Sequence, residues 1–189
     1  MNSFCDASRR SLLLGLAGLA SATTTSAAHA ASARQINADA SQALRTLYAT
    51  QPRAKELGQR AKAILIFPRI HKAGFMVGAQ TGDGALQVGG RIVAYYNISA
   101  ASFGMQAGVQ RFSYALFFMT DAALNYLDKS DGWQIGSGPS VVVVDKGAAR
   151  SMTTTTLTQD VYAFPFGQKG LMAGLGLEGS KITRIQPSA

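Results

Sequence analysis

The sequence predicts an α+β protein in which two N-terminal helices pack on a strongly curved, glycine-rich, barrel-like antiparallel β-sheet. Apolar residues follow a helical spacing only between residues 33 and 63. From residue 64 onward, short alternating segments separated by turn residues are typical of strands. Glycine recurs inside these segments, and because isolated glycines weaken a flat strand, many of them indicate bends, bulges or close backbone contacts. One short helix is expected to interrupt the sheet near residues 121–128.

The first 30 residues have the features of a cleaved signal peptide. Arg9 and Arg10 precede the apolar run LLLGLAGLA, and Ala28-His29-Ala30 forms an A-x-A cleavage site. The apolar run is much shorter than the roughly 18 residues that span a bilayer. The arginine pair favours the twin-arginine export route, and an ordinary secretory signal that carries two arginines is the alternative. We therefore expect residues 31–189 to form a single periplasmic or secreted domain, peripheral to an envelope membrane.

Two helices are expected at the start of this domain. Residues 33–48 place apolar side chains at the helical positions that follow Ile36, and Ser32 is a suitable N-cap. Pro52 suits the first position of a second helix, which is expected to extend to about residue 63.

Strands are expected in most of the remaining chain. Residues 64–67 are uniformly apolar, which indicates a short buried strand that Pro68 would end. The stretch 75–88 predicts two strands joined by a turn at Gly82-Asp83-Gly84. Further strands are expected within residues 89–99, 102–120, 133–135, 141–144, 153–158, 161–166 and 181–185.

Gly174, Gly176 and Gly179 reproduce the G-x-G-x-x-G spacing of a dinucleotide-binding loop. Such a loop needs a helix after it, because the pyrophosphate binds at the helix N-terminus, and an acidic residue further on for the ribose. Only ten residues follow Gly179, they alternate like a strand, and none of them is acidic. We therefore interpret these glycines as parts of strands and expect no nucleotide ligand.

Positive charge is concentrated in the first quarter of the expected domain. Residues 31–72 hold eight basic and two acidic residues, a net charge of +6, whereas residues 73–189 have a net charge of +1. An anionic lipid surface attracts each nearby Lys or Arg by about 1 kcal/mol, so this segment predicts binding to anionic phospholipid. The alternative is that these residues form ordinary solvated helix faces. The candidate lipid-binding residues are Arg45, Arg53, Lys55, Arg60, Lys62, Arg69 and Lys72.

No set of residues in the sequence predicts catalysis or a metal site. Outside the predicted signal peptide there is no cysteine and a single histidine, His71, near Arg69 and Lys72. Positive neighbours disfavour protonation of a histidine, and a lone histidine in a predicted turn is typical of a surface residue. Neither H-x-x-x-H nor G-x-S-x-G occurs. We therefore expect a non-enzymatic protein without cofactor or metal, and an exported protein is not expected to meet nucleic acid.

Four blocks of the sequence occur in an order that resembles the SYLF domain family, in particular its bacterial branch. They are ILIFPRIHKAGFMVGAQTGDG, SFGMQAGVQRFSYALFFMTDAALNYL, GPSVVVV and QKGLMAGLGLEGSKI. The resemblance extends over residues 35–185 and implies that the glycines near the end belong to the final strands. It also implies a lipid-surface or interaction module, because eukaryotic relatives are implicated in binding phosphoinositide-rich membranes and, in fungi, actin.

The resemblance carries over only in part. An exported protein meets neither actin nor phosphoinositides, so an actin-binding label would be inherited by homology alone. Anionic phospholipid or lipopolysaccharide is the expected local equivalent. The predicted function is therefore peripheral association with anionic lipid through the basic N-terminal segment. The alternative is a structural factor of the cell envelope whose basic face binds a protein or a polyanionic glycan.

Overall fold

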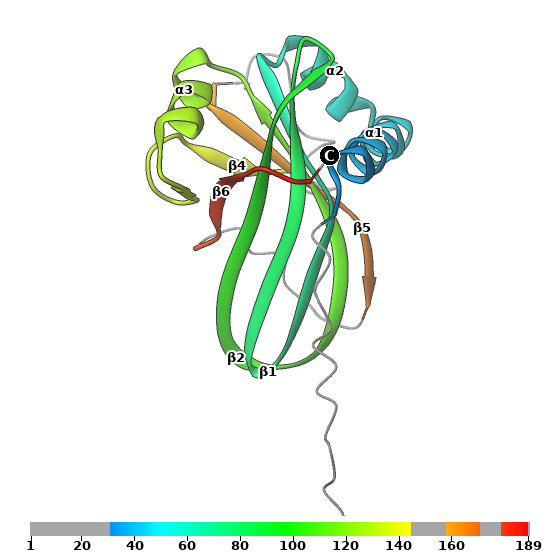
Figure 1. Cartoon of the computed structure of the whole chain (residues 1–189), viewed down its shortest axis with the longest axis vertical. Coiled ribbons are helices and arrows are strands. Elements are labelled where there is room, and N and C mark those ends of the chain that lie inside the picture. Colours follow the sequence, from blue (N-terminus) through cyan, green and yellow to red (C-terminus); the bar gives the residue numbers. More distant parts are fainter. Residues whose placement is uncertain (1–30, 145–157, 171–178, 189) are drawn as a thin grey trace, which may run out of the picture.

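The computed structural model describes residues 31–144, 158–170 and 179–188 of the chain and confirms the α+β class. Figure 1 shows helices gathered at one end of a long, strongly curved sheet. In chain order the elements are α1 (Ala33–Thr50), α2 (Pro52–Arg60), β1 (Ala63–Val88), β2 (Arg91–Phe118), α3 (Asp121–Lys129), β3 (Trp133–Gln134), β4 (Val141–Val143), β5 (Val161–Gly170) and β6 (Lys181–Ile185).

The two N-terminal helices form for the reasons that the sequence indicates. The Ser32 side chain caps α1 by accepting a hydrogen bond of 3.3 Å from the backbone N–H of Gln35. Pro52 occupies the start of α2, where its missing N–H has no consequence. The buried residues of α1 and α2 pack on the convex face of the sheet, and α2 ends at Arg60, slightly earlier than expected.

The predicted turn at Gly82-Asp83-Gly84 is wrong, because β1 continues through these residues as one strand. The hairpin between β1 and β2 instead turns at Gly89 and Gly90, whose φ angles are +55° and +83°. A two-residue hairpin turn with positive φ at both positions matches the twist of the flanking strands, which explains why two glycines stand there. Pro68 does not end the first strand either, since it lies in a register shift between Phe67 and Ile70.

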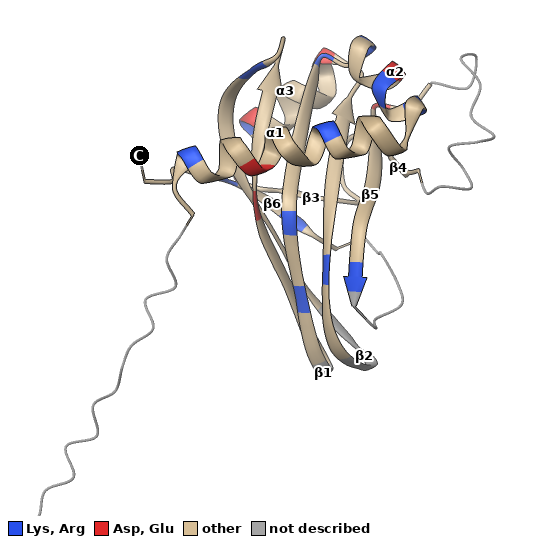
Figure 2. Cartoon of the chain, turned by 90° about the vertical axis from the view of Figure 1, so that its right-hand side faces the viewer, with Lys and Arg blue, Asp and Glu red and all other residues tan. Residues whose placement is uncertain are grey.

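Glycines inside β1 permit the strand to fold back on itself. Figures 1 and 2 show the β1–β2 hairpin running away from the helices, bending and returning toward them. A Cβ atom added to Gly82 would lie 2.5 Å from the carbonyl oxygen of Arg69, and one added to Gly84 would lie 2.5 Å from that of Ile66. The two arms of β1 therefore touch through backbone at Gly82 and Gly84, which the sequence had assigned to a turn.

The sheet has the strand order β3-β6-β2-β5-β4, with β1 paired to β2. Every pairing is antiparallel except that of β4 with β5, which is parallel and was not expected. Gly179, with φ of +76°, lies in a turn before β6 rather than in a strand. Residues 153–157 of the expected strand at 153–158, together with Gly174 and Gly176, lie outside the described residues, and Thr158 belongs to no strand.

Two hydrophobic clusters lie on opposite faces of the sheet. The concave face buries Tyr96, Phe118 and Trp133, whereas Phe117 lies under α1 and α2 on the convex face. These aromatic side chains are at most 1% exposed, so they are core residues. Tyr95 is only partly buried against the convex cluster.

Asp160 ties the start of α3 to the strands. Its carboxylate accepts hydrogen bonds from the Ser140 backbone N–H (3.1 Å), the Ser140 hydroxyl (3.0 Å) and the Thr120 hydroxyl (3.2 Å). The pKa of Asp160 is lowered, first by the backbone N–H of Ser140 and then by its hydroxyl. A carboxyl with a lowered pKa in the folded state stabilises the protein above its unfolded pKa, and this contribution is lost as the pH falls through the folded value.

We therefore expect Asp160→Ala to lower the free energy of unfolding by about 1–2 kcal/mol at neutral pH. The difference from the parent should shrink below pH of about 4, where the carboxyl begins to bind a proton in the unfolded chain. Urea unfolding of both proteins at pH 7 and pH 3 measures this. An equal difference at the two pH values would show that the charge of Asp160 contributes nothing.

Candidate functional site

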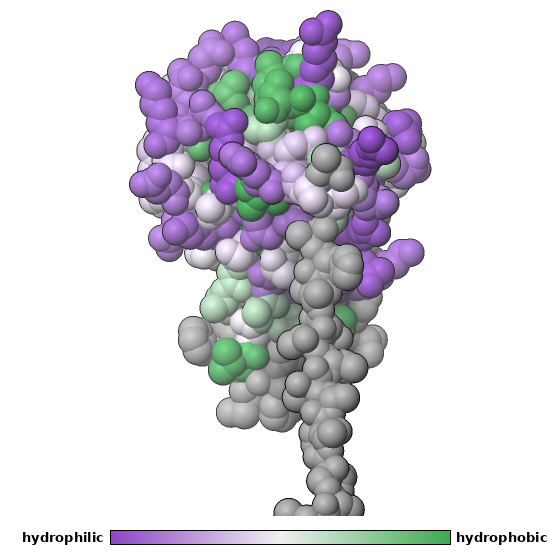
Figure 3. All heavy atoms as spheres, viewed as in Figure 1, coloured by the Kyte–Doolittle hydropathy of each residue, from purple (hydrophilic) through white to green (hydrophobic). Residues whose placement is uncertain are grey.

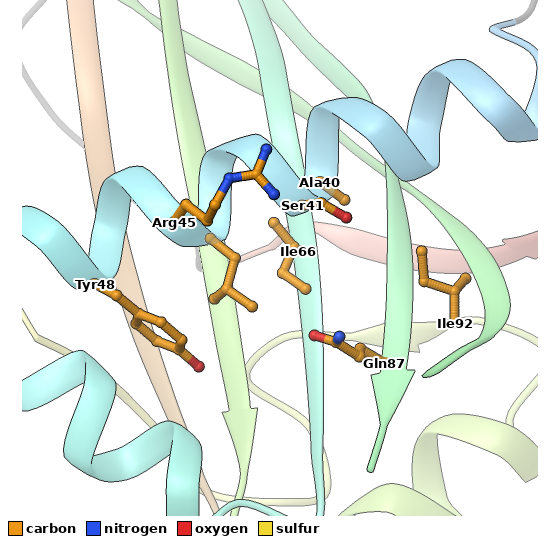
Figure 4. Close-up of a pocket in the computed structure, with 8 residues that line it drawn as sticks. Ala40, Ser41, Arg45, Tyr48, Ile66, Gln87 and Ile92 are labelled. Carbon is orange, nitrogen blue, oxygen red and sulfur yellow. The ribbon is translucent and has the colours of Figure 1, made fainter. Parts of the chain in front are cut away.

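A shallow notch lies between α1 and the convex face of the sheet (Figure 4). Its volume is about 240 Å³. Apolar side chains from α1, β1 and β2 line it, and polar groups stand around them. The lining residues are Ala40, Ser41, Leu44, Arg45, Tyr48, Ile66, Gln87 and Ile92. Clefts that enclose a small-molecule ligand usually measure about 300–1,000 Å³, so the notch can hold only part of such a molecule.

Arg45 is the cation of this notch. It is exposed on α1, and its guanidinium donates a hydrogen bond of 2.7 Å to the neutral side chain of Gln42. No carboxylate neutralises it among the described residues. Arg34, which the sequence prediction omitted, is also exposed and lies three helical turns before Arg45, and therefore on the same side of α1.

Apart from Lys72, the other predicted lipid-binding residues fall into two groups. Lys55 and Arg60 are exposed on α2, and within the described part of the chain neither has an acidic partner. The other three, Arg53, Lys62 and Arg69, are in ion pairs. These pairs are Arg53 with Glu56, Lys62 with Asp121 at 3.2 Å, and Arg69 with Asp39. Exposed ion pairs contribute little to stability, but their cations are partly neutralised already.

Lys72 is separated from the other predicted residues by burial. It is only 8% exposed and lies in β1 directly opposite Gln110, which is fully buried. Both residues belong to the row of side chains on the concave face, because side chains alternate between the faces of a strand. The structure therefore places Lys72 apart from the helices. Arg45, Lys55 and Arg60 are the predicted residues that α1 and α2 expose without a carboxylate partner among the described residues.

The strands are also basic. The near-neutral net charge of residues 73–189 as a whole conceals this feature. The described strands contain seven Lys and Arg residues but a single acidic residue, Asp83. Among the described residues, the other acidic residues of the second part of the chain lie in α3 (Asp121 and Asp128) and in loops (Asp131 and Asp160). A count of charges over each predicted strand would have revealed this pattern.

A second hollow, of about 300 Å³, contains His71 together with Asp39, Arg69 and Asp83. His71 lies within β1 rather than in the predicted turn, and it faces Arg111 on β2. Its pKa is lowered, first by burial and then by Arg111 and Arg69. The hollow mixes carboxylates with cations, and the Arg69–Asp39 ion pair spans it, so it lacks the uniform charge that an anionic ligand requires.

The described residues include no group of three or more His, Cys, Asp or Glu side chains suited to a metal ion. None of the helices in the described part of the chain has the length and apolar character needed to span a membrane.

Comparison with known proteins identifies the second part of the chain. Residues 99–187 match the family described as "Ysc84: Las17-binding protein actin regulator", whereas no curated protein matches the sequence. The match includes most of β2 and all of α3, β3, β4, β5 and β6. Three of the four blocks that suggested the SYLF family lie entirely within it. The description names binding and regulation and no chemical reaction. Residues 99–187 are thus similar to the Ysc84 (SYLF) family, the family that the sequence resembles.

Proposed function

We propose that this protein is a non-enzymatic lipid-binding protein that associates peripherally with anionic phospholipid through α1 and α2. The observation that carries the proposal is a set of exposed cations without carboxylate partners among the described residues, beside an apolar notch. They are Arg34, Arg45, Lys55 and Arg60. Figure 2 shows the basic positions of α1 and α2 on the side of the molecule that faces the viewer.

The chemistry of these groups fits lipid phosphates at a surface. Each Lys or Arg near an anionic leaflet contributes about 1 kcal/mol, so several together give substantial affinity without a deep pocket. The notch supplies the apolar part, because Leu44, Ile66 and Ile92 can contact the upper segment of an acyl chain while Arg45 meets the phosphate. Its small volume favours a surface contact over enclosure of a soluble ligand.

The family description supports binding in general, and it leaves a protein partner as the second candidate. Because residues 1–30 are predicted to be a signal peptide, we propose that the protein acts outside the cytoplasm. The anionic surface available to it there is a membrane that contains anionic phospholipid. A protein or glycan of the envelope would meet the same basic face.

Sedimentation with vesicles tests the proposal. Residues 31–189, which contain every described element, should sediment with vesicles whose phosphatidylglycerol content rises from zero to one half, in proportion to that content. Binding should weaken with added salt, because the screening length falls from about 8 Å at physiological ionic strength to about 3 Å at 1 M. Equal binding to neutral and anionic vesicles would refute electrostatic attachment and leave the protein or glycan partner.

A further inference from the structure

The bend of the β1–β2 hairpin is free of charged residues. Residues 73–82 and 92–110 contain no Asp, Glu, Lys or Arg. Figure 1 places this bend at the far end of the molecule from α1 and α2. Toward that end, the described side chains in Figure 3 are mostly neutral to apolar in colour. We call the residues of this bend whose side chains the structure describes, 73–74, 77–79 and 108–110, the hairpin tip.

Valine side chains of the hairpin tip are turned to solvent. Val77 is 59% exposed and Val109 is 68% exposed, the largest value among the exposed large apolar side chains of the described residues. Val109 pairs directly with Ala73, which is also exposed. Their neighbour Gln110 is buried, so alternation turns the polar amide inward and the apolar groups outward, which is the reverse of the usual arrangement for a water-facing sheet.

Cations stand immediately behind the exposed valines. Arg111 follows Val109 by two residues on the same outward face, which corresponds to about 7 Å along the strand. Lys169 of β5 pairs directly with Arg111, and both side chains are exposed. Neither has an acidic partner among the described residues, and the strands β2 and β5 contain no acidic residue. Figure 2 shows basic positions on β1, β2 and β5 above the bend.

We propose that the hairpin tip is a second membrane contact, which dips its valines into the acyl boundary of an anionic bilayer while Arg111 and Lys169 bind lipid phosphates. Along the strand, apolar side chains at the tip are followed by cations. In a leaflet, apolar acyl chains are followed by anionic phosphates, so each group of the strand would meet its complement. Interfacial elements bury their apolar face by about 5–10 Å, which agrees with the spacing between Val109 and Arg111. The β1–β2 ladder continues through Gly74 and Gly108, so the strands carry their own backbone partners to this depth.

A second copy of the chain is the other possible occupant of an exposed apolar end. Tip-to-tip association would bring two positively charged ends toward each other and would offer Arg111 and Lys169 no anionic partner. Lipid phosphates are complementary to these cations. The charges therefore favour a bilayer as the occupant. This contact goes beyond the proposed function, because that function rests on α1 and α2.

A neutral double variant tests the hairpin tip. Val77→Gln combined with Val109→Gln removes the apolar groups and leaves the charge unchanged, and Val93→Gln is the matched control. Val93 is 54% exposed on β2 but lies beside the Gly89–Gly90 turn, away from the bend. We expect the double variant to bind phosphatidylglycerol vesicles roughly tenfold more weakly and the control to bind like the parent. Equal binding of the double variant and the control would overturn the proposal.

A label reports depth independently of affinity. Residues 31–189 contain no cysteine, so Val109→Cys provides a single site for an environment-sensitive fluorophore. Its emission should shift to the blue on vesicles and be quenched by spin-labelled acyl chains, whereas the same label at Val93→Cys should not respond. Absence of quenching at position 109 on vesicles that bind the protein would overturn the proposal, even if α1 and α2 bind as proposed. Quenching that persists after the helix cations are neutralised would support the tip alone.

Sedimentation velocity tests whether a second copy occupies the tip. A dimer that the Gln variants dissociate would identify a second copy as the occupant and overturn the proposal.

Discussion

Replacing Gly84 by alanine is expected to destabilise the fold by about 3 kcal/mol. A Cβ atom at this position would lie 2.5 Å from the carbonyl oxygen of Ile66 and 2.5 Å from a ring carbon of Phe67. Phe67 is fully buried, and Ile66 belongs to the ladder with β2, opposite Ala115. Relief of the clash therefore requires a shift of backbone or core, which a close-packed interior resists. For a domain of this size the loss corresponds to a melting temperature lower by roughly 6–12 °C.

The control for this variant lies in the same hairpin. Gly89 has nothing within 4 Å of an added Cβ atom, and its φ of +55° is one that asparagine tolerates. Gly89→Asn also creates an Asn-Gly turn, the preferred pair for a two-residue hairpin. It should leave the melting temperature almost unchanged. If thermal melting followed by circular dichroism gave Gly84→Ala the same stability as Gly89→Asn, the contact between the two arms of β1 would not exist in solution.

The hairpin also shows where sequence reasoning about the fold reached its limit. Both Gly82-Asp83-Gly84 and Gly89-Gly90 are chemically suited to a turn, and the alternating residues on either side allow either choice. The choice depends on tertiary contact, because Gly82 and Gly84 are needed where the first arm of β1 approaches within 2.5 Å of their Cβ positions. Such a requirement comes from residues more than ten positions away and leaves no local signal. The helices were predicted well because caps and spacing are local.

The predicted basic surface was limited in the same way. The sequence identifies Arg69 and Lys62 as cations, but not that Asp39 and Asp121, distant along the chain, lie against them. It also does not show that Lys72 is turned to the concave face beside Gln110. The sequence thus locates the cations along the chain. Which of them retain an uncompensated charge on the surface depends on how the strands and helices are folded together.

Neutralising Arg45 and Lys55 together is expected to weaken binding to anionic vesicles by roughly 30-fold. Each cation near an anionic leaflet contributes about 1 kcal/mol, and tenfold in affinity corresponds to about 1.4 kcal/mol. Both side chains are exposed and lack acidic partners among the described residues, so glutamine at these positions should leave stability unchanged. The measurement is a titration with vesicles rich in phosphatidylglycerol at low salt, with far-ultraviolet circular dichroism as the check of folding.

The matched control removes the same amount of charge elsewhere. Lys129 at the end of α3 and Lys181 on β6 are exposed, and within the described residues neither has an acidic partner. Converting both to glutamine lowers the net charge by the same amount, so any loss of affinity from net charge alone appears in both variants. A site on α1 and α2 requires that the Arg45 and Lys55 variant lose much more than the control, and that the difference disappear at 1 M salt, where screening is short-ranged. Equal losses in the two variants would mean that the protein binds anionic lipid through its overall charge, without a specific helical face.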